Sequence, residues 1–480
     1  DEAGFRQAMD KHRLASGAGE AFGPLGGEDV DVYRLLRSRL EADEQLGPEG
    51  VRYNPYQWLE VEGPVLALVS QGQPVEQAGP GDKVEVLLPE TGFYVESGGQ
   101  VSDTGMIVSV EEPRWEIRVT DMRKPAAGII VHVGEVARGN PKTGQEAIAR
   151  VDMQRRRDIM RNHTATHLLH AELHEVLGEH ARQAGSLVAP DRLRFDFTHP
   201  EAVTPDQLER IEAGVNRAIL GDYALNITIK PLQQAIAEGA MALFGEKYGE
   251  TVRNITIGGP EPFSNELCGG THVSETGDIG LFLVTGEGSA AAGIRRIEAV
   301  TGRGAYELVQ RRFRALKLAA ASLATTPEDV PAKTHDLLDQ ADDLRKQVAG
   351  LRRDLASHEF IDHLQNTPTV AGVPVLTSNL PGADAETLRQ MADRFRQRYP
   401  SGVVVLASVS EDGRPVLIAA VTEDLVKRGL HAGELVKHVA QPLGGGGGGR
   451  PTLAQAGGKD AGQLENALAS VPEWVEKKLK

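Results

Sequence analysis

Residues 60 to 150 alternate apolar and polar positions in short runs such as VLALV, KVEVLL and GMIVSV, and glycine and proline separate the runs. A period of two is typical of strands with one buried face, and glycine and proline are the residues that end strands and turn the chain. The pattern therefore predicts a small β-barrel over residues 51–150.

A helical pattern follows, and after it segments with helical and strand patterns are mixed. Residues 153–178 are predicted to form a helix that ends at Gly178. From 181 to 300, helices are expected at 205–221 and 231–245, and the segments between them read as strands: LRFDF, LNITIK, NITIGG and IGLFLV. This mixture predicts an α+β core over residues 151–302.

The next segment has heptad spacing. Apolar residues recur at alternating intervals of four and three, with charged residues between them: Leu337, Ala341, Leu344, Val348, Leu351 and Leu355. A helix is also expected over 303–324, and Pro327 and Pro331 mark a break between the two. We therefore expect a helical hairpin, or coiled coil, over residues 303–365.

Beyond the hairpin, strand-like and helical segments alternate. VPVLTSNL, GVVVLASV and PVLIAAV read as strands, and residues 384–398 read as a helix. Residues 366–480 are therefore predicted to form an α/β domain, and the whole chain to be an α+β multidomain protein.

Composition narrows the class of protein. A chain of 480 residues exceeds the size of a single core, so two to four domains are expected. There is no apolar run of 18 residues and no signal peptide, which argues against membrane and secreted proteins. The single cysteine excludes an internal disulfide and fits a reducing, cytoplasmic location.

The formal net charge of −16 argues against a nucleic-acid partner for the chain as a whole. Basic residues nevertheless cluster locally, at 155–157 with Arg161, at Arg295 and Arg296, and at 311–317. A solvated helix face explains each cluster taken alone. The first two clusters lie close to the metal motifs described next, and this favours a role in binding phosphate.

Two short motifs carry the clearest chemistry. Residues 163–167 read HTATH, and residues 268–272 read CGGTH. Histidines four apart share one face of a helix, so His163 and His167 can face one ion, and Cys268 and His272 can supply two further ligands. Nitrogen and sulfur donors suit Zn²⁺ better than Ca²⁺ or Mg²⁺. His170 and His174 continue the same stripe, so spacing alone does not say which histidines bind.

Ordered motifs resemble those of a known family. HTATHLLHAEL, QAGSLVAPDRLRFDF, CGGTHVSETGDIGLF and GIRRIEAVTG are similar to the editing domain of alanyl-tRNA synthetase, a class II aminoacyl-tRNA synthetase. FYVESGGQVSDTG resembles the barrel that precedes that domain, and LGGGGGGRPTLAQAGG resembles the C-terminal DHHA1-like domain. The opening residues DEAGFRQAMDKHRLASG resemble a helix that follows the family's tRNA-recognition domain, so a helical linker is expected over residues 1–50.

The resemblance implies an editing function. We expect the editing and C-terminal half of a synthetase, without the aminoacylation core, that hydrolyses the ester of tRNA(Ala) mischarged with serine or glycine. Zn²⁺ would be the cofactor, with either a catalytic or a structural role, and tRNA(Ala) the partner. The C-terminal domain, residues 366–480, would bind tRNA, and the C-terminal part and its heptads could support a homodimer.

The resemblance also assigns roles to single residues. Thr166 and Gln183 would meet the substrate in the editing pocket, although Thr166 could also bond back to its own helix and Gln183 could be an ordinary turn residue. Arg295 and Arg296 would contact phosphate, unless they form salt bridges between strands. The Gly444–Gly449 run would be a loop offering backbone N–H groups to phosphate, so Gly446, Gly447 and Arg450 are predicted to contact tRNA.

Two other functions stay open at this point. A free-standing trans-editing enzyme of the AlaX type would share the zinc motifs and the hydrolysis. A non-catalytic tRNA-binding module with structural zinc would bind tRNA without deacylating it. Threonyl-tRNA synthetase also has an HxxxH and CxxxH editing domain, but the GGQVSDTG and glycine-rich segments fit it poorly.

Overall fold

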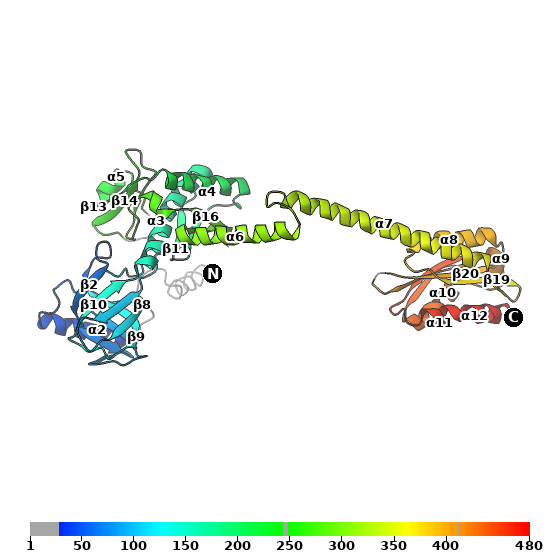
Figure 1. Cartoon of the computed structure of the whole chain (residues 1–480), viewed down its shortest axis with the longest axis horizontal. Helices are drawn as coiled ribbons and strands as arrows, with labels where there is room; N and C mark the ends of the chain where they lie inside the picture. The colour runs from blue at the N-terminus through cyan, green and yellow to red at the C-terminus, as the bar shows by residue number, and fades with distance from the viewer. Residues whose placement is uncertain (1–27, 243–247, 411) are drawn as a thin grey trace, which may run out of the picture. The chain divides into compact units, whose positions relative to one another are not determined.

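The computed structural model describes residues 28–242, 248–410 and 412–480. Its helices and strands form two compact units that divide between Ala315 and Leu316 (Figure 1). Several sheets and helices alternate along the chain, which confirms the prediction of a mixed α+β multidomain protein. The opening segment predicted to be helical, residues 1–17, lies outside the described residues. No helix in the described ranges is both long and apolar enough to cross a membrane.

The N-terminal unit begins with a sheet module, which we define as residues 52–151. It contains one eight-stranded sheet in the order β2-β10-β7-β8-β9-β5-β3-β4, and a short parallel pair, β1-β6. Helix α2 (Glu28–Ala42) precedes it. The strand bounds are β1 Arg52–Tyr53, β2 Glu60–Pro64, β3 Ala67–Ser70, β4 Gln73–Val75, β5 Lys83–Leu87, β6 Glu90–Thr91, β7 Gly105–Ser109, β8 Glu116–Ala126, β9 Ile129–Arg138 and β10 Glu146–Val151.

Alternation in the sequence predicted these strands because every second side chain is buried. Val84 and Val86 are buried in β5, and Ala147 and Ala149 are buried in β10. The expected closed barrel is not confirmed: in the part of the chain that the structure describes, no sheet is closed, since the eight-stranded order runs openly from β2 to β4. Strand patterning predicts which face is buried and carries no information on closure.

The rest of this unit is the α+β module, residues 153–301. Helix α3 (Met153–Leu177) leads into it from the sheet module (Figure 1). One antiparallel sheet has the order β11-β12-β17-β16 and a second the order β13-β14-β15. The remaining bounds are β11 Gln183–Val188, β12 Leu193–Thr198, α4 Pro205–Leu220, β13 Leu225–Pro231, α5 Leu232–Ala237, β14 Thr251–Ile257, β15 Ser264–Leu267, the 3-10 turn Thr276–Ile279, β16 Phe282–Ala291 and β17 Ile294–Thr301.

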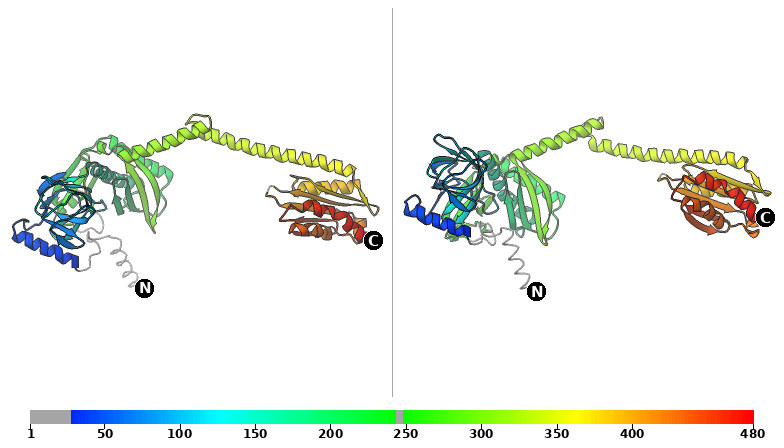
Figure 2. Two further views of the ribbon diagram at one scale, coloured as in Figure 1. Left: turned by 60° about the horizontal axis from the view of Figure 1, so that its bottom comes forward. Right: turned by 90° about the horizontal axis from the view of Figure 1, so that it is seen from below.

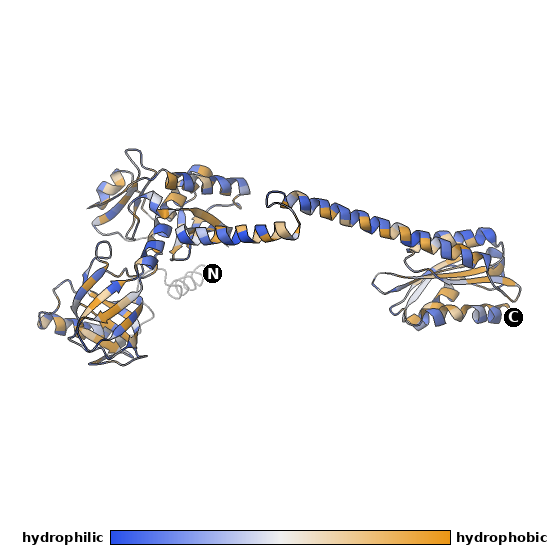
Figure 3. Ribbon diagram, in the orientation of Figure 1, coloured by the Kyte–Doolittle hydropathy of each residue, from blue (hydrophilic) through white to orange (hydrophobic). Residues whose placement is uncertain are grey.

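Two helices occupy the segment predicted as a hairpin, α6 (Gly302–Ser322) and α7 (Val330–Gln365). Apolar positions recur along α7 among hydrophilic ones (Figure 3). Most of these heptad side chains are exposed: Leu337, Leu344, Val348, Leu351 and Leu355 keep 40 to 69% of their accessible surface. The pairing of the two helices as a hairpin stays a prediction.

The C-terminal unit contains a six-stranded sheet in the order β18-β19-β20-β21-β23-β22, with helices on both faces (Figures 1 and 2). Val403 and Val405 of β20 face a core formed with α10, α11 and α12, whereas Val404 and Leu406 face one formed with α7 and α8. The bounds are β18 Thr369–Val370, β19 Val373–Asn379, α8 Ala385–Arg398, β20 Val403–Val409, β21 Pro415–Val421, α9 Glu423–Lys427, α10 Ala432–Ala440, β22 Gly446–Arg450, β23 Leu453–Gly457, α11 Leu464–Ala469 and α12 Val471–Leu479.

The sheet of this unit is mixed. Strands β19 and β20 are parallel, as an α/β fold requires, while the pairs β20-β21, β21-β23 and β22-β23 are antiparallel. The alternation of strands and helices was predicted, but sequence pattern does not distinguish a helix that crosses over a sheet from one that packs beside it.

The glycine run does not form the predicted loop. Gly446 to Arg450 is the edge strand β22, paired antiparallel with β23. Glycine is required there because a Cβ on Gly447 would lie 2.2 Å from the carbonyl oxygen of Gln455, and one on Gly449 would lie 2.5 Å from that of Leu453. The prediction of Gly446, Gly447 and Arg450 as a phosphate-binding loop is therefore wrong in its local structure.

Candidate metal centre

Helix α3 supplies the first two candidate ligands. Its N-terminus is capped by the Asp152 carboxylate, which accepts hydrogen bonds from the N–H groups of Gln154 and Arg155, and it ends before Gly178, which has a φ of 107°. His163 and His167 lie on one buried face, with ring centroids 5.5 Å apart and planes within 7° of parallel. The helix thus presents both imidazoles in the same direction, as their spacing predicted.

The loop after β15 supplies the other two ligands. Cys268 immediately follows this strand, and His272 comes four residues later, so Gly269 and Gly270 lie in the loop between them. A Cβ on Gly270 would lie 1.9 Å from Cε1 of His163. Glycine is therefore needed for the loop to reach the helix.

The four side chains converge. One ligand atom from each of His163, His167, Cys268 and His272 lies within 4.8 Å of all the others. The Sγ atom of Cys268 is 3.3 Å from Nε2 of His163 and 3.4 Å from Nε2 of His272. Donor atoms around a tetrahedral Zn²⁺ are about 3.4 to 3.7 Å apart, given the usual bond lengths. The donor set and its spacing therefore fit zinc.

Glu266 holds the second histidine of the helix. One of its carboxylate oxygens is 2.8 Å from Nδ1 of His167, and the other is 3.2 Å from Nδ1 of His170. Nε2 of His167 is buried and has no hydrogen-bond partner among the described residues. A metal-binding histidine commonly donates its other N–H to a carboxylate, which fixes the ring and frees the ligating nitrogen. This arrangement fits His167 as a candidate ligand and His170 as a residue that supports the candidate site.

The electrostatics favour an anionic sulfur. Burial acts to raise the pKa of the Cys268 thiol, but electrostatic and hydrogen-bond interactions with the surrounding imidazole groups hold that pKa well below its ordinary value. Burial also disfavours charge on His167, yet Glu266 raises the pKa of His167 to about 10. The thiolate is the form of cysteine that binds metal, so the site is prepared for a cation.

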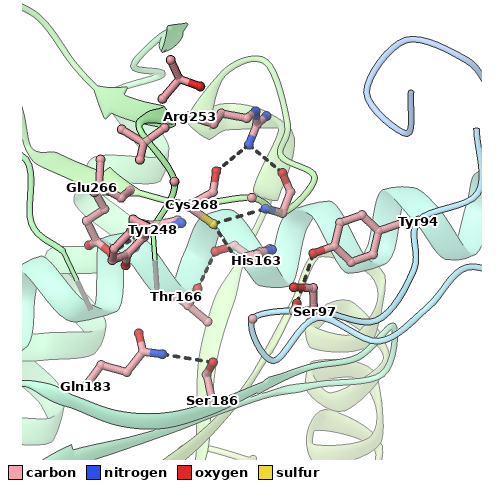
Figure 4. A pocket seen from close by; sticks show the side chains of 18 residues that line it. Tyr94, Ser97, His163, Thr166, Gln183, Ser186, Tyr248, Arg253, Glu266 and Cys268 are labelled. Carbon is pink, nitrogen blue, oxygen red and sulfur yellow. Dashed lines mark hydrogen bonds and ion pairs between the residues drawn. The ribbon is translucent and has the colours of Figure 1, made fainter. Parts of the chain in front are cut away.

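A pocket of about 270 Å³ opens beside these ligands (Figure 4). Thr166 and Gln183 both line it, together with Ser186 and Tyr94. The Thr166 hydroxyl donates to the backbone oxygen of His163 at 2.6 Å, and Nε2 of Gln183 donates to Oγ of Ser186 at 3.2 Å. The structure thus places both predicted substrate residues next to the ligand cluster, although Thr166 also makes the bond back to its helix.

Several basic residues near the site form ion pairs with acidic residues of the protein. Arg295 is paired with Glu287 at 2.6 Å, and Arg296 makes two bonds to Asp196 at 2.7 and 2.8 Å. Arg156 is fully buried and bonded to Asp103. These guanidinium groups hold strands and loops together, so phosphate binding by Arg295 and Arg296 stays a prediction.

No role was predicted from the sequence for several residues that lie at the site. Glu266 stands two residues before Cys268, which was the available signal for it. Arg253 donates to the backbone oxygens of Cys268 and Gly270 at 2.9 and 2.8 Å, and it stacks over the ring of Tyr56 at 4.2 Å. Such interactions join residues far apart in the chain, and local sequence patterns do not predict them.

Comparison with known families agrees with the arrangement of these motifs. A family described as threonyl and alanyl tRNA synthetase second additional domain matches residues 252–298, which include Cys268 and His272. The family of class II (A) tRNA synthetases matches residues 1–155, and the DHHA1 domain matches residues 372–477.

Whole-chain relatives extend the similarity. The alanine–tRNA ligase of Geobacillus thermodenitrificans is 45% identical over 99% of this chain and 52% of its own length. That of Dechloromonas aromatica is 46% identical over 100% of this chain and 52% of its own. The C-Ala domain from Aquifex aeolicus alanyl-tRNA synthetase, a crystal structure, is 30% identical and covers 23% of this chain and 97% of that one, with a TM-score of 0.22.

The chain spans about half the length of the curated relatives it matches. Identities of 41 to 46% run over nearly all of its residues, and three family models match separate segments of it. This chain is therefore a homologue of the alanyl-tRNA synthetases, corresponding to about half of such a protein.

Proposed function

We propose that the chain is an editing hydrolase that removes serine or glycine from mischarged tRNA(Ala). The observation that carries this proposal is the convergence of His163, His167, Cys268 and His272 beside a pocket lined by Thr166 and Gln183. Editing is needed because a pocket built for alanine rejects a missing methyl group or an added hydroxyl only weakly.

Zinc is the proposed cofactor, held by those four side chains. When bound, it would either supply Lewis-acid chemistry to the ester or anchor the 3′ end of the tRNA. Four protein ligands fill a tetrahedral shell, as in structural sites. The loop Cys268–His272 is held by Arg253, so the ligands keep their positions whichever of the two roles applies.

The pocket residues can select the substrate. Because the Thr166 hydroxyl donates its proton to the His163 carbonyl, its lone pairs are left to accept a hydrogen bond from a serine hydroxyl. Gln183 is oriented by Ser186 and presents a second polar group. A site that hydrogen-bonds a hydroxyl discriminates against an analogue without one, so this hydrogen bond favours seryl-tRNA(Ala) over correctly charged alanyl-tRNA(Ala). Glycine has no hydroxyl, so its removal would depend on other features of the pocket.

The test compares seryl-tRNA(Ala) with alanyl-tRNA(Ala) as substrates of the purified chain. We expect hydrolysis of the seryl ester and little of the alanyl ester. Thr166→Val keeps the shape and removes the hydroxyl, and it should lower the preference for serine about 10-fold, the worth of one hydrogen bond of about 1.4 kcal/mol. An unchanged preference would exclude Thr166 as the selecting residue.

A non-catalytic tRNA-binding module is the second candidate. The DHHA1 match at residues 372–477 favours a separate role for the C-terminal unit, and we propose that this unit contacts the tRNA body. Tight tRNA binding without any deacylation in the same assay would favour this function over editing.

A further inference from the structure

Gln100 lies in the loop of the sheet module that reaches the metal centre. Its side chain is fully buried, and its backbone pairs with Ser97 in the loop and with Val188 of β11. The preceding Gly99 has a φ of 83°, and a Cβ there would lie 2.4 Å from Oγ of Ser186. The loop can approach the pocket this closely because a glycine precedes the glutamine.

The carboxamide of Gln100 joins the two ligand segments. Its Oε1 accepts from the N–H of Thr271 at 2.9 Å and lies 2.7 Å from Nδ1 of His163. Its Nε2 donates to Oγ1 of Thr271 at 2.9 Å. One side chain of the sheet module is therefore bonded both to helix α3 and to the loop that carries Cys268 and His272.

These bonds determine which nitrogen of His163 carries the proton. A backbone N–H only donates, so the atom facing Thr271 must be the amide oxygen of Gln100, and this removes the usual ambiguity between the amide atoms. The same oxygen can only accept from Nδ1 of His163. The proton of the neutral ring is therefore on Nδ1, and the lone pair of Nε2 points toward Sγ of Cys268, 3.3 Å away.

A second residue of the sheet module supports the same loop. The Tyr56 hydroxyl donates to the backbone oxygen of Gly269 at 2.7 Å. The loop between Cys268 and His272 is thus held from the sheet module at Gly269 and at Thr271, on either side of the glycine that contacts His163.

We propose that Gln100 is a positioning residue of the metal centre, which selects the Nε2-binding form of His163 and makes the sheet module an integral part of the site. This inference rests on the zinc site of the proposed function. Partners that orient a ligating histidine change metal affinity about 10- to 100-fold when removed. The expected effect is therefore on metal binding itself, before any reaction with tRNA.

The experiment measures the affinity of the full chain for Co²⁺ and Zn²⁺, by cobalt absorption and by competition with a chelator. Gln100→Met keeps the length of the side chain without an acceptor, and we expect its affinity to fall about 10- to 100-fold. Gln100→Glu keeps an acceptor for Nδ1 of His163 and should stay closer to the original protein. Gln73→Met, at an exposed position of the same sheet module, is the matched control and should bind normally.

The outcomes separate this inference from the proposed function. Normal affinity and an unaltered cobalt spectrum in Gln100→Met would overturn the positioning role while leaving the zinc site in place. If Gln100→Met unfolds, Gln100→Glu decides: a folded Glu variant with strongly weakened binding contradicts the role of the acceptor. Failure of the unsubstituted chain to bind either ion would overturn both this inference and the proposed cofactor.

Discussion

Two buried polar residues, Gln100 and Glu266, lie far in the sequence from the histidines that they contact. His163, His167, Cys268 and His272 were predicted as candidates from their spacing, because a helix turn and a glycine-rich loop are local structures. Gln100 acts 63 residues from His163, and Glu266 acts 96 residues from His170. Only tertiary structure brings such partners together, so the bonds that Gln100 and Glu266 make to the histidines were not predictable from the sequence.

Glu266 offers a test at this scale. Glu266→Ala should destabilise the metal-free N-terminal unit by about 3 kcal/mol, since it leaves the buried rings of His167 and His170 without their carboxylate. Urea unfolding measures the change. Glu261→Ala, at an exposed position, is the control and should cost less than about 0.5 kcal/mol. Equal effects of the two substitutions would show that the buried network contributes no stability.

At the scale of single elements, helices and strands whose side chains show a clear period were predicted well. The glycine-rich strand β22 was not predicted. Helix α3 ends before Gly178 as expected, and the alternating residues of the sheet module form strands. The glycine run has no side chains from which a period of two can be read, so it resembles a loop in sequence. Its partner strand β23 and the close approach of Ala454 and Ala456 determine its structure.

The two faces of β22 give a prediction with an internal control. Gly447→Ala should lower the stability of the C-terminal unit by about 1 to 3 kcal/mol, because the added methyl group meets Gln455 and Ala456. Gly448→Ala adds a methyl group that meets nothing within 4 Å, so it should be nearly neutral. Thermal unfolding of both variants measures the difference. Equal stability of the two would mean that Gly446–Arg450 does not form this strand.

The exposed heptads of α7 predict self-association. Leu344 and Leu351 are 59% and 69% exposed on one stripe of this helix, and burying such a stripe against a second copy is the usual reason for heptad spacing. We expect a dimer in analytical ultracentrifugation, which Leu344→Lys combined with Leu351→Lys should dissociate. Ala349→Lys, an exposed position on the opposite side of the helix from the stripe, serves as the control. A monomeric unsubstituted chain would rule out this role for the heptads.

At the scale of the whole molecule, a mixed α+β multidomain protein was predictable, and the closure and topology of its sheets were not. The barrel prediction described the strands without the open order of their sheet, and the α/β prediction did not foresee the antiparallel pairs. The net charge of −16 gave no hint of tRNA. Relatives and motifs, and not charge, support tRNA as the partner.

The two compact units predict separable functions. Removing residues 366–480 should leave metal content at about one zinc per chain, because all four ligands lie in the N-terminal unit. It should also weaken tRNA binding and reduce its salt dependence, because the shortened chain would neutralise fewer phosphates. Titrations of tRNA at several salt concentrations measure both. An unchanged dissociation constant and salt slope would show that residues 366–480 serve another purpose.

The central claim is that the site built around Cys268 hydrolyses mischarged tRNA(Ala). Single-turnover deacylation of seryl-tRNA(Ala), measured alongside zinc content for the unsubstituted chain and for Cys268→Ala combined with His272→Ala, tests it most directly. The account predicts deacylation and about one zinc per chain for the former, and loss of both in the double variant. Deacylation that persists at the original rate in the metal-free double variant would contradict it.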